Sequence, residues 1–533
     1  MTSHSLLFDP AICNVAAKRR CRASLPEVLA LLSTGEIESF PALRPHQAPA
    51  WHQFLVQLAA LACHAARTGE PFEDAAAWRE ALLALTPEWP GGEAFTLVVD
   101  DVTRPAFLQA PLADAADFAS FRNVLATPDA LDLLVTSKNH DLKAERMTAA
   151  TPEHWVFALV ALQTQEGIMG AGKYGISRMN GGYGSRPFLG VRPPGGPGRW
   201  FRRDVVRLLA ARSEILENFA GFAKRRAVGL VWTEPWDGMR QLGIDELDPF
   251  YIEICRRLRL SVEDGIVVAR DAGSKAARIA AKELKGATGD PWAPIAREER
   301  KVFSVTADGF DYRRMVSLLD GSKYQRPPLA MPDQSDAAEG LAIVAAALAR
   351  GQGKTEGFHT RTLPVSKEVA SLLGRPAAAH ALAQLGQRRV GEVGNFYARV
   401  LRGALFQLFQ GGPEEIDWRK DSSEAQAQPW RARYNARIDR IFFAHLFDAF
   451  AAEQAGDFER KDELEQRWRE SVRGIGRDVL YDAIAAAPRK AATWHRARAR
   501  ALGFFEAQAR IHLDLPIAAS AAEEPADDQP RAS

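Results

Sequence analysis

The spacing of hydrophobic positions divides the chain into a mixed N-terminal part and a helical C-terminal part. Up to residue 364, segments with apolar positions at helical spacing alternate with short apolar runs bounded by Gly, Pro and polar residues. Such alternation predicts helices interspersed with strands. We therefore expect an α+β fold: a mixed α/β N-terminal domain over residues 1–364, an all-α four-helix bundle over 365–515, and a disordered tail over 516–533.

The ends of several N-terminal helices can be placed from their capping residues. Ser24 is a favourable N-cap, and Gly35 is a favourable residue just past a helix end. Thr151 begins a helix whose first residue is Pro152, and this helix leads into Gly167. Helices are predicted over 24–35, 49–67, 74–85, 151–167 and 203–219, and a further one over 340–351. Strands are predicted in the apolar segments 6–12, 93–101 and 227–236.

The C-terminal part carries the apolar stripes of long amphipathic helices. We predict four, over 367–409 with a possible break at Pro376, 431–453, 459–487 and 489–512. Helices of this length with short connections are typical of a bundle. The arginines on their outer faces are most simply solvated surface residues.

Composition and charge are those of an ordinary globular protein of several domains. The 533 residues are 47% hydrophobic and 25% charged, and the net charge is only +1, so any anion-binding surface must be local. The four cysteines form no CxxC pair, which indicates neither a zinc site nor a disulfide framework. The sequence shows neither a signal peptide nor an apolar run long enough to span a membrane, so we expect a cytoplasmic protein.

One window stands out from this average composition. Residues 167–203 hold eleven glycines and seven Lys or Arg residues but no Asp or Glu. Glycine lets main-chain N–H groups approach a ligand closely, and arginine forks fit phosphate oxygens. The window therefore favours contact with phosphate or nucleic acid; the alternative is a long, solvated basic loop.

Two further loops resemble catalytic motifs without completing them. GQGKT at 351–355 lacks the Walker glycine, whose place is taken by Leu348, and it follows a predicted helix rather than a strand. KNHD at 138–141 contains His140, but no second histidine or paired acid stands beside it to complete a metal-dependent nuclease centre. What remains is three basic or Gly-rich loops at 136–146, 167–203 and 351–361, a pattern typical of a binding protein that is neither an enzyme nor a cofactor carrier.

Several segments follow one another in a characteristic order. They are LLFDPAI, RPAFLQAPL, LVALQTQEG entering the Gly-rich loop, RGQGKTEGFHTR, and the Arg-rich C-terminal bundle. Through this order the chain resembles the CasA family, the large subunits of type I-E CRISPR Cascade complexes. The resemblance implies a subunit without catalytic activity that recognises the protospacer-adjacent motif (PAM) on double-stranded DNA, helps to open the duplex into an R-loop, and recruits the helicase-nuclease in antiviral defence. The implied partners also include the CRISPR RNA 5′ handle and the other Cascade subunits.

The resemblance also implies which residues contact nucleic acid. It places Gly167 and Gly170 against the minor groove of the PAM, with Lys285 as a matching groove lysine. The loop before the bundle supplies a wedge, with Gln352, Lys354 and Thr355 as candidates. The remaining candidates are Lys138, Asn139 and Lys143 near the RNA handle, and Lys173, Arg178 and Arg186 in the lengthened glycine loop.

The chain departs from the family pattern in two ways. It lacks the zinc-binding cysteine pairs of some members, so no metal is assigned. The loop around Gly353 is also not a plain copy of the family's asparagine-glutamine wedge, so the side chain that acts as the wedge is not assigned. Two alternatives remain: a metal-dependent nuclease using His140, and a scaffold of another RNA–protein assembly. If the chain is a CasA-type subunit that reads the PAM, Gly167→Asp should abolish motif-dependent binding while leaving the fold intact.

Overall fold

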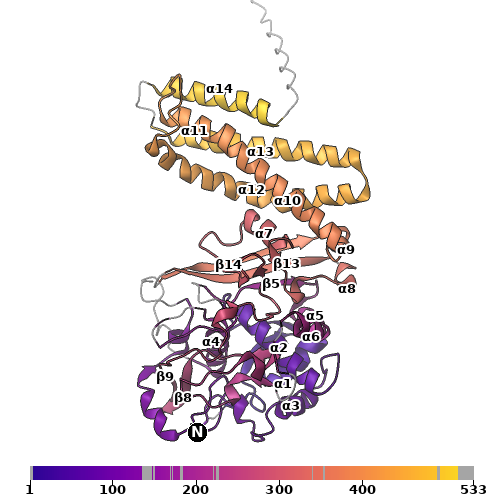
Figure 1. Cartoon of the computed structure of the whole chain (residues 1–533), viewed down its shortest axis with the longest axis vertical. Coiled ribbons are helices and arrows are strands. Elements are labelled where there is room, and N and C mark those ends of the chain that lie inside the picture. Colours follow the sequence, from indigo (N-terminus) through magenta and orange to yellow (C-terminus); the bar gives the residue numbers. More distant parts are fainter. Residues whose placement is uncertain are drawn as a thin grey trace, which may run out of the picture. The chain divides into compact units, whose positions relative to one another are not determined.

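The chain folds into two compact units, Met1–Ala383 and Gln384–Ser533, in the computed structural model (Figure 1). The structure describes residues 4–134, 147, 150–167, 170, 172–179, 184–219, 221–223, 227–338, 340–351, 354–488 and 493–513. The predicted domain boundary at 364/365 lies nineteen residues before the division between the units, so α9 (Lys367–Leu373) and the start of α10 (Pro376–Phe396) belong to the N-terminal unit.

The N-terminal helices begin and end as their capping residues predict. Ser24 and Glu27 form a capping box at the start of α1 (Leu25–Thr34), and Gly35 ends it with a φ of 81°. The predicted helices 49–67, 74–85 and 151–167 are confirmed as α2 (Ala48–Ala65), α3 (Ala75–Ala84) and α4 (Pro152–Gln165). The single helix predicted over 203–219 is instead two helices, α5 (Gly196–Ala210), which begins seven residues earlier, and α6 (Arg212–Asn218).

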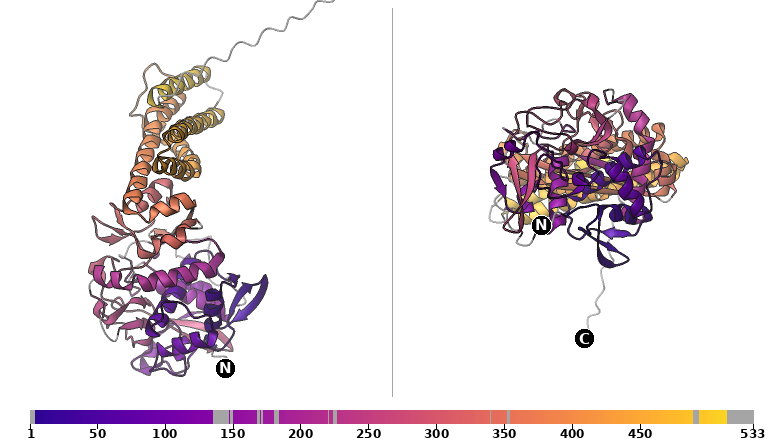
Figure 2. Two further views of the ribbon diagram at one scale, coloured as in Figure 1. Left: turned by 90° about the vertical axis from the view of Figure 1, so that its right-hand side faces the viewer. Right: turned by 90° about the horizontal axis from the view of Figure 1, so that it is seen from below.

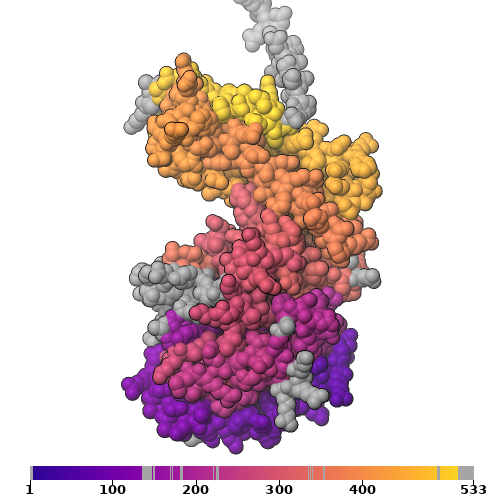
Figure 3. Space-filling view, viewed as in Figure 1, coloured from indigo at the N-terminus to yellow at the C-terminus, as the bar shows by residue number. Residues whose placement is uncertain are grey.

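Helix α2 lies in the middle of the N-terminal unit and packs against α4, α5 and β7 (Leu247–Ile252). Its side chains are apolar on nearly every face, and most residues from Trp51 to Cys63 are buried. A helix that is apolar all round must be enclosed. The surrounding core includes Trp155, Trp232 and Trp292. In the space-filling view, segments from distant parts of the chain share one surface around this core (Figure 3).

Within the described residues, the strands of the N-terminal unit form five small sheets. Their orders are β2-β1-β3, β4-β9-β8, β11-β10-β12, β14-β13-β5 and the parallel pair β6-β7. The strands are β1 (Ile12–Ala16), β2 (Arg19–Ala23), β3 (Ile37–Ser39), β4 (Asn123–Leu125), β5 (Phe188–Arg192), β6 (Val228–Leu230), β8 (Arg257–Glu263), β9 (Ile266–Ala272), β10 (Ile295–Ala296), β11 (Lys301–Val302), β12 (Tyr324–Gln325), β13 (Leu341–Gly351) and β14 (Lys354–Val365). Figure 2 shows the indigo hairpin β1–β2 at the edge of the unit.

The helix predicted over 340–351 is wrong, because this segment is the central strand β13. It pairs antiparallel with β14 along its whole length and with β5 on its other edge. Residues 345–350 are all buried, so the strand lacks the alternation of a half-exposed strand. Its alanines, which favour helix, complete the misleading pattern.

Two predicted strands are also wrong. Residues 93–101 begin with the short 3₁₀ helix η1 (Glu93–Phe95). Residues 6–8 form turns, and the strand begins only at Ile12, the last residue of the predicted segment 6–12. A single bridge between Ser5 and Thr96 joins the two segments. Their apolar side chains enter the core from irregular backbone, as Leu6, Leu7 and Phe95 show. The remaining short helices are η2 (Ala115–Ser120), η3 (Pro128–Leu131), η4 (Val231–Thr233), η5 (Ile244–Glu246), η6 (Lys282–Leu284), α7 (Tyr312–Leu319), η7 (Pro328–Ala330) and α8 (Gln334–Ala337).

The C-terminal unit is helical, as predicted. The break before Pro376 is confirmed, and a π-helical turn, η8 (Tyr397–Leu401), interrupts the helix that continues as α11 (Arg402–Phe409). The other helices are α12 (Asp421–Ala455), α13 (Phe458–Ala486) and α14 (Trp494–Leu513). Helix α12 starts ten residues before the predicted position and accommodates Pro429. Among the described residues, we find no helix whose length and hydropathy would let it cross a membrane.

Candidate nucleic-acid interface

The Gly-rich segment leaves helix α4 and immediately folds back on itself. The N–H of Gly167 donates to the carbonyl of Gly184 at 3.2 Å, and Glu166 forms a bridge with Ser185. Further along, Gly170 and Lys173 exchange backbone hydrogen bonds of 2.7 and 3.0 Å. The glycine loop, residues 166–186, is therefore held at its two ends by its own backbone.

Gly167 and Gly170 have different surroundings. Gly167 is buried, and a Cβ there would lie 2.6 Å from the carbonyl oxygen of Gly184 and 3.1 Å from Met179. Gly170 is exposed, and a Cβ there would have no atom within 4 Å. The expectation that Gly167→Asp leaves the fold intact is therefore wrong, because any side chain at this position displaces the loop's own backbone. Among the described glycines of this loop, Gly170 is the one around which a ligand would meet no protein atom within 4 Å of an added Cβ.

Lys173 lies on the exposed part of this loop and forms an ion pair with Asp271 of β9. The lysine side chain is 51% exposed and the aspartate 10%. The same loop contacts the turn after β9, where the N–H of Ser274 donates to the carbonyl of Gly172 at 2.9 Å. Lys275 follows directly and is exposed. Sequence reasoning missed Lys275, because it stands about a hundred residues away in a segment with no unusual composition.

The β13–β14 hairpin carries the GQGKT segment at its tip. Lys354 is 59% exposed and lies 3.3 Å from the carboxylate of Glu356. The hydroxyl of Thr355 donates to the carbonyl of Leu134 at 2.9 Å. The Walker interpretation is excluded, since the chain leaves the tip as strand β14 and not as a helix. The expectation that the motif follows a helix is wrong, whereas the absence of the Walker glycine at Leu348 still holds.

A buried ion pair joins the bases of the three predicted loops. Arg350, at the end of β13, contacts both carboxylate oxygens of Glu166 at 2.8 and 3.1 Å, and its guanidinium also donates to the carbonyl of Leu133. Leu133 and Leu134 lead into the segment 136–146, and Gly184 forms a bridge with the neighbouring Ala349. The structure thus brings together the bases of the 136–146, 167–203 and 351–361 segments, which the sequence presents as separate.

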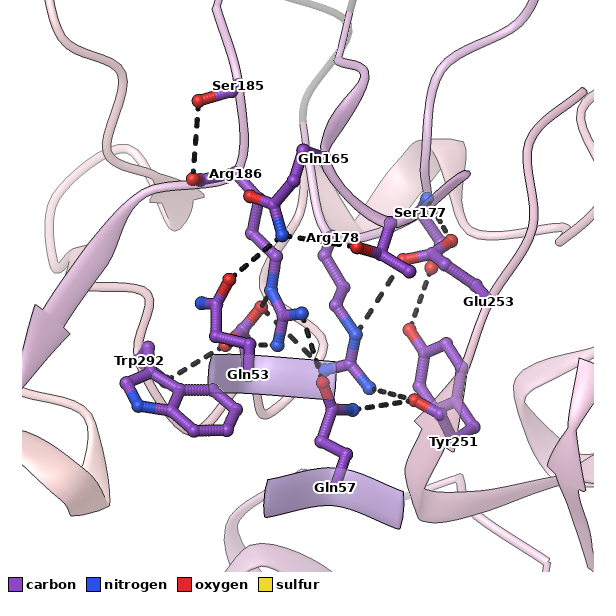
Figure 4. Close-up of polar contacts among 12 residues, drawn as sticks. Gln53, Gln57, Gln165, Ser177, Arg178, Ser185, Arg186, Tyr251, Glu253 and Trp292 are labelled. Carbon is purple, nitrogen blue, oxygen red and sulfur yellow. Dashed lines mark hydrogen bonds and ion pairs between the residues drawn. The ribbon is translucent and has the colours of Figure 1, made fainter. Parts of the chain in front are cut away.

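Arg178 and Arg186 require a correction, because they are not surface residues. Their exposed fractions are 1% and 3%, and Figure 4 shows both guanidinium groups turned inward. Arg186 binds both oxygens of Asp290 at 2.6 and 3.1 Å and donates to Gln57 at 3.0 Å. Arg178 donates to the carbonyl of Tyr251 at 2.8 Å. Both guanidinium groups bind buried partners inside the protein, so neither arginine is a candidate DNA contact.

The cluster formed by Arg178, Arg186, Glu253 and Asp290 lies beneath the glycine loop. Arg178 is 3.6 Å from Glu253 and 3.8 Å from Asp290. Burial alone would raise the pKa of the Asp290 carboxyl, but Arg186 and Arg178 outweigh it and hold that pKa below its usual value. Burial raises the pKa of the Glu253 carboxyl, and Arg178 offsets only part of this effect. Two cations thus face one firmly ionised carboxylate.

Lys285 occupies a tight turn next to the same loop. Its φ of 50° is left-handed, and its carbonyl accepts the N–H of Val302 at 3.0 Å. A Cβ on the following Gly286 would lie 3.0 Å from the carbonyl oxygen of Arg178. The Lys285 side chain is exposed. The turn therefore packs on the glycine loop and presents a lysine beside it.

Four of the candidate residues lie outside the described part of the chain. They are Lys138, Asn139, Lys143 and Gln352, and His140 of the nuclease alternative lies there too. Within the described residues, no group of three or more His, Cys, Asp or Glu side chains is placed to hold a metal ion, and the four cysteines are free.

Comparison with known proteins gives matches along almost the whole chain. A family model described as CRISPR-associated protein Cse1 matches residues 6–479. Among solved structures, Cse1 from Acidimicrobium ferrooxidans is 16% identical, with a TM-score of 0.59 over 96% of this chain and 98% of that one. CasA from Thermus thermophilus is 14% identical, with a TM-score of 0.61 over 95% and 99%. Thermobifida fusca Cse1 is 14% identical, with a TM-score of 0.59 over 96% and 99%. No curated protein matches.

Proposed function

Because the chain belongs to the CRISPR-associated Cse1 family, also called CasA, we propose that it recognises the PAM on double-stranded DNA as the large subunit of a type I-E Cascade complex. In this role it helps to open the duplex and recruits the helicase-nuclease, without catalysis of its own. Its partners are then the target duplex, the CRISPR RNA 5′ handle, the other Cascade subunits and the helicase-nuclease, all met in the cytoplasm.

The observation that carries this proposal is the meeting of the three loop bases at Arg350 and Glu166. A duplex that reaches the open backbone at Gly170 finds exposed lysines on the same loop and on the turns packed against it, namely Lys173, Lys275 and Lys285. Lysines near a groove contact phosphates without regard to sequence, while open glycine backbone allows approach to base edges.

A reader of this kind suits a short flanking motif. The minor groove presents a degenerate pattern of donors and acceptors, so a backbone-and-lysine reader accepts several related motifs. Guide pairing then reads the remaining sequence. Unstacking a base-pair step costs about 1–2 kcal/mol, so a wedge at the β13–β14 tip supported by a few phosphate contacts is sufficient to begin opening without ATP.

Two of the candidate lysines are neutralised in the free protein. Lys173 is paired with Asp271, and Lys354 with Glu356. A phosphate must compete with these carboxylates, which lowers non-specific affinity for DNA. Asp271→Asn should therefore increase binding to duplexes that lack the motif, with a steeper salt dependence.

The decisive experiment measures DNA binding by the guide-loaded complex with and without this subunit. The duplexes are identical except for the base pairs beside the target. We expect the subunit to confer discrimination among flanks, and Gly170→Asp to remove it. Arg20→Gln, a charge removed from the exposed strand β2, is the matched control and should discriminate as the wild type does. Equal binding to all flanks by the wild-type complex would reduce the chain to a scaffold.

A further inference from the structure

One buried ion pair connects the base of the β13–β14 tip to the base of the glycine loop. The guanidinium of Arg350 binds both carboxylate oxygens of Glu166 at 2.8 and 3.1 Å, and it also donates to the carbonyl of Leu133. Gly170 follows Glu166 by four residues, and Lys354 follows Arg350 by four residues. The two parts of the surface proposed to meet DNA therefore start from the two ends of the same ion pair.

Ser185 makes a second connection between the same two elements. Its N–H donates to the carbonyl of Leu348 at 2.9 Å, and its hydroxyl accepts the N–H of Leu348 at 2.8 Å. Ser185 is buried and also forms a bridge with Glu166. The end of the glycine loop therefore cannot shift along β13 unless buried hydrogen bonds break, and each unsatisfied buried group costs about 1–3 kcal/mol.

The hairpin changes its register at Arg350. Ala349 pairs with Gly357, and Arg350 pairs with Thr355. Glu356 is therefore an extra residue on β14, which is the arrangement of a β-bulge. A bulge bends its strand and re-aims nearby side chains, and bulges are common next to functional sites. Because this bulge lies at the base of the tip, the direction of the tip depends on how Arg350 is held.

An ion pair in this position supplies geometry more than stability. Burial removes water from both charges, and this loss consumes most of their attraction, so apolar replacements of similar volume are often as stable. A guanidinium that contacts both oxygens of a carboxylate instead fixes a distance and a direction. Apolar side chains at positions 166 and 350 would pack without fixing either quantity.

We propose that Arg350 and Glu166 are positioning residues, which hold the open backbone at Gly170 and the wedge at the hairpin tip in register with neighbouring base pairs. Successive base pairs are only about 3.4 Å apart, so a tip displaced by that distance would insert at the wrong step. This inference rests on the proposed function and adds a coupling to it: reading of the motif directs the opening of the duplex through one buried ion pair.

The test uses the guide-loaded complex and measures the two steps separately. Affinity for duplexes with different flanks reports reading of the motif, and 2-aminopurine fluorescence at the first base pairs beside it reports opening. We expect Arg350→Met to retain the preference among flanks and to slow opening about tenfold, within the usual range of coupling between sites. Arg350→Lys, which keeps the charge but loses the fork, should slow opening less. Arg20→Met, at an exposed arginine of β2, is the matched control and should open DNA as the wild type does.

A duplex whose first base pairs are mismatched needs no wedge and separates positioning from folding. On this duplex, Arg350→Met should pair with the guide as fast as the wild type, which a misfolded variant would not do. The inference is overturned if Arg350→Met opens the matched duplex at the wild-type rate, or if it stays slow on the mismatched one. A wild-type complex that binds all flanks equally would overturn the proposed function as well, whereas a selective wild type with an equally fast variant overturns this inference alone.

Discussion

Replacing Asp290 by Asn should destabilise the N-terminal unit strongly, because it removes the anion that two buried arginines share. The wild-type carboxylate accepts two hydrogen bonds from Arg186 and one from the N–H of Trp292 at 2.9 Å, and it lies 3.8 Å from Arg178. In the variant, only Glu253, whose pKa is raised, remains to balance both cations.

Breaking a buried ion pair by removing one partner costs about 3–5 kcal/mol. An unfolding entropy of about 2.1 cal/mol/K per residue gives the 383-residue unit about 0.8 kcal/mol/K. The expected decrease in Tm is therefore about 4–6 °C. Scanning calorimetry of the full chain measures it, and hydrogen exchange assigns the transition to the N-terminal unit.

Two further variants sharpen this measurement. Asp308→Asn removes the same charge from an exposed position and should leave Tm within about 1 °C of the wild type. Adding Arg186→Met to Asp290→Asn removes an uncompensated cation and should recover part of the loss. The reasoning is refuted if Asp290→Asn unfolds at the wild-type temperature. It is also refuted if Arg186→Met lowers the Tm of the Asp290→Asn variant by as much as it lowers the Tm of the wild type.

Three other outcomes follow from the same structure. Gly167→Ala should increase hydrogen exchange in residues 166–186, since its Cβ would lie 2.6 Å from a carbonyl oxygen, whereas Gly170→Ala should not; equal exchange in both would contradict the packing argument. The pKa of the Glu253 carboxyl is raised on folding, so its contribution to stability is fully present below its unfolded pKa of about 4.5 and is lost as pH rises through the folded pKa. The Tm of the wild type should therefore decrease over this pH range, and Glu253→Gln should make that decrease smaller. A Tm profile against pH that is the same in the variant and the wild type would contradict this assignment. Tyr397→Phe should leave the C-terminal unit as stable or stabilise it by about 1 kcal/mol, because the buried Tyr397 hydroxyl has no hydrogen-bond partner in the described structure; a clear decrease in Tm would indicate an undetected partner.

Helix boundaries could be predicted well where a local device sets them. Ser24, Gly35 and Pro376 each act on backbone within a few residues, so their effect is visible in the sequence alone. Strand β13 could not be predicted in this way, because its apolar run fits a buried helix and a fully buried strand equally. Only its pairing with β5 and β14 decides between them.

At the candidate site too, local features could be predicted from the sequence and long-range contacts could not. Composition marks the three unusual loops with the exposed Lys173 and Lys354, whereas the exposed Lys285 is identified only through the family resemblance. The sequence assigned Arg178 and Arg186 to the surface, because an unpaired arginine and a buried, paired one look the same without their partners. Asp290, which pairs with Arg186, stands 104 residues away.

The sequence by itself determined the family, the capped helices and the concentration of glycine and positive charge after α4, since each depends on residue order or on neighbours along the chain. Tertiary structure decided which glycine is open and which is packed, which arginines face inward, and that the three loops share one base at Arg350 and Glu166. Those outcomes depend on contacts between residues far apart in sequence, and such contacts exist only once the chain has folded.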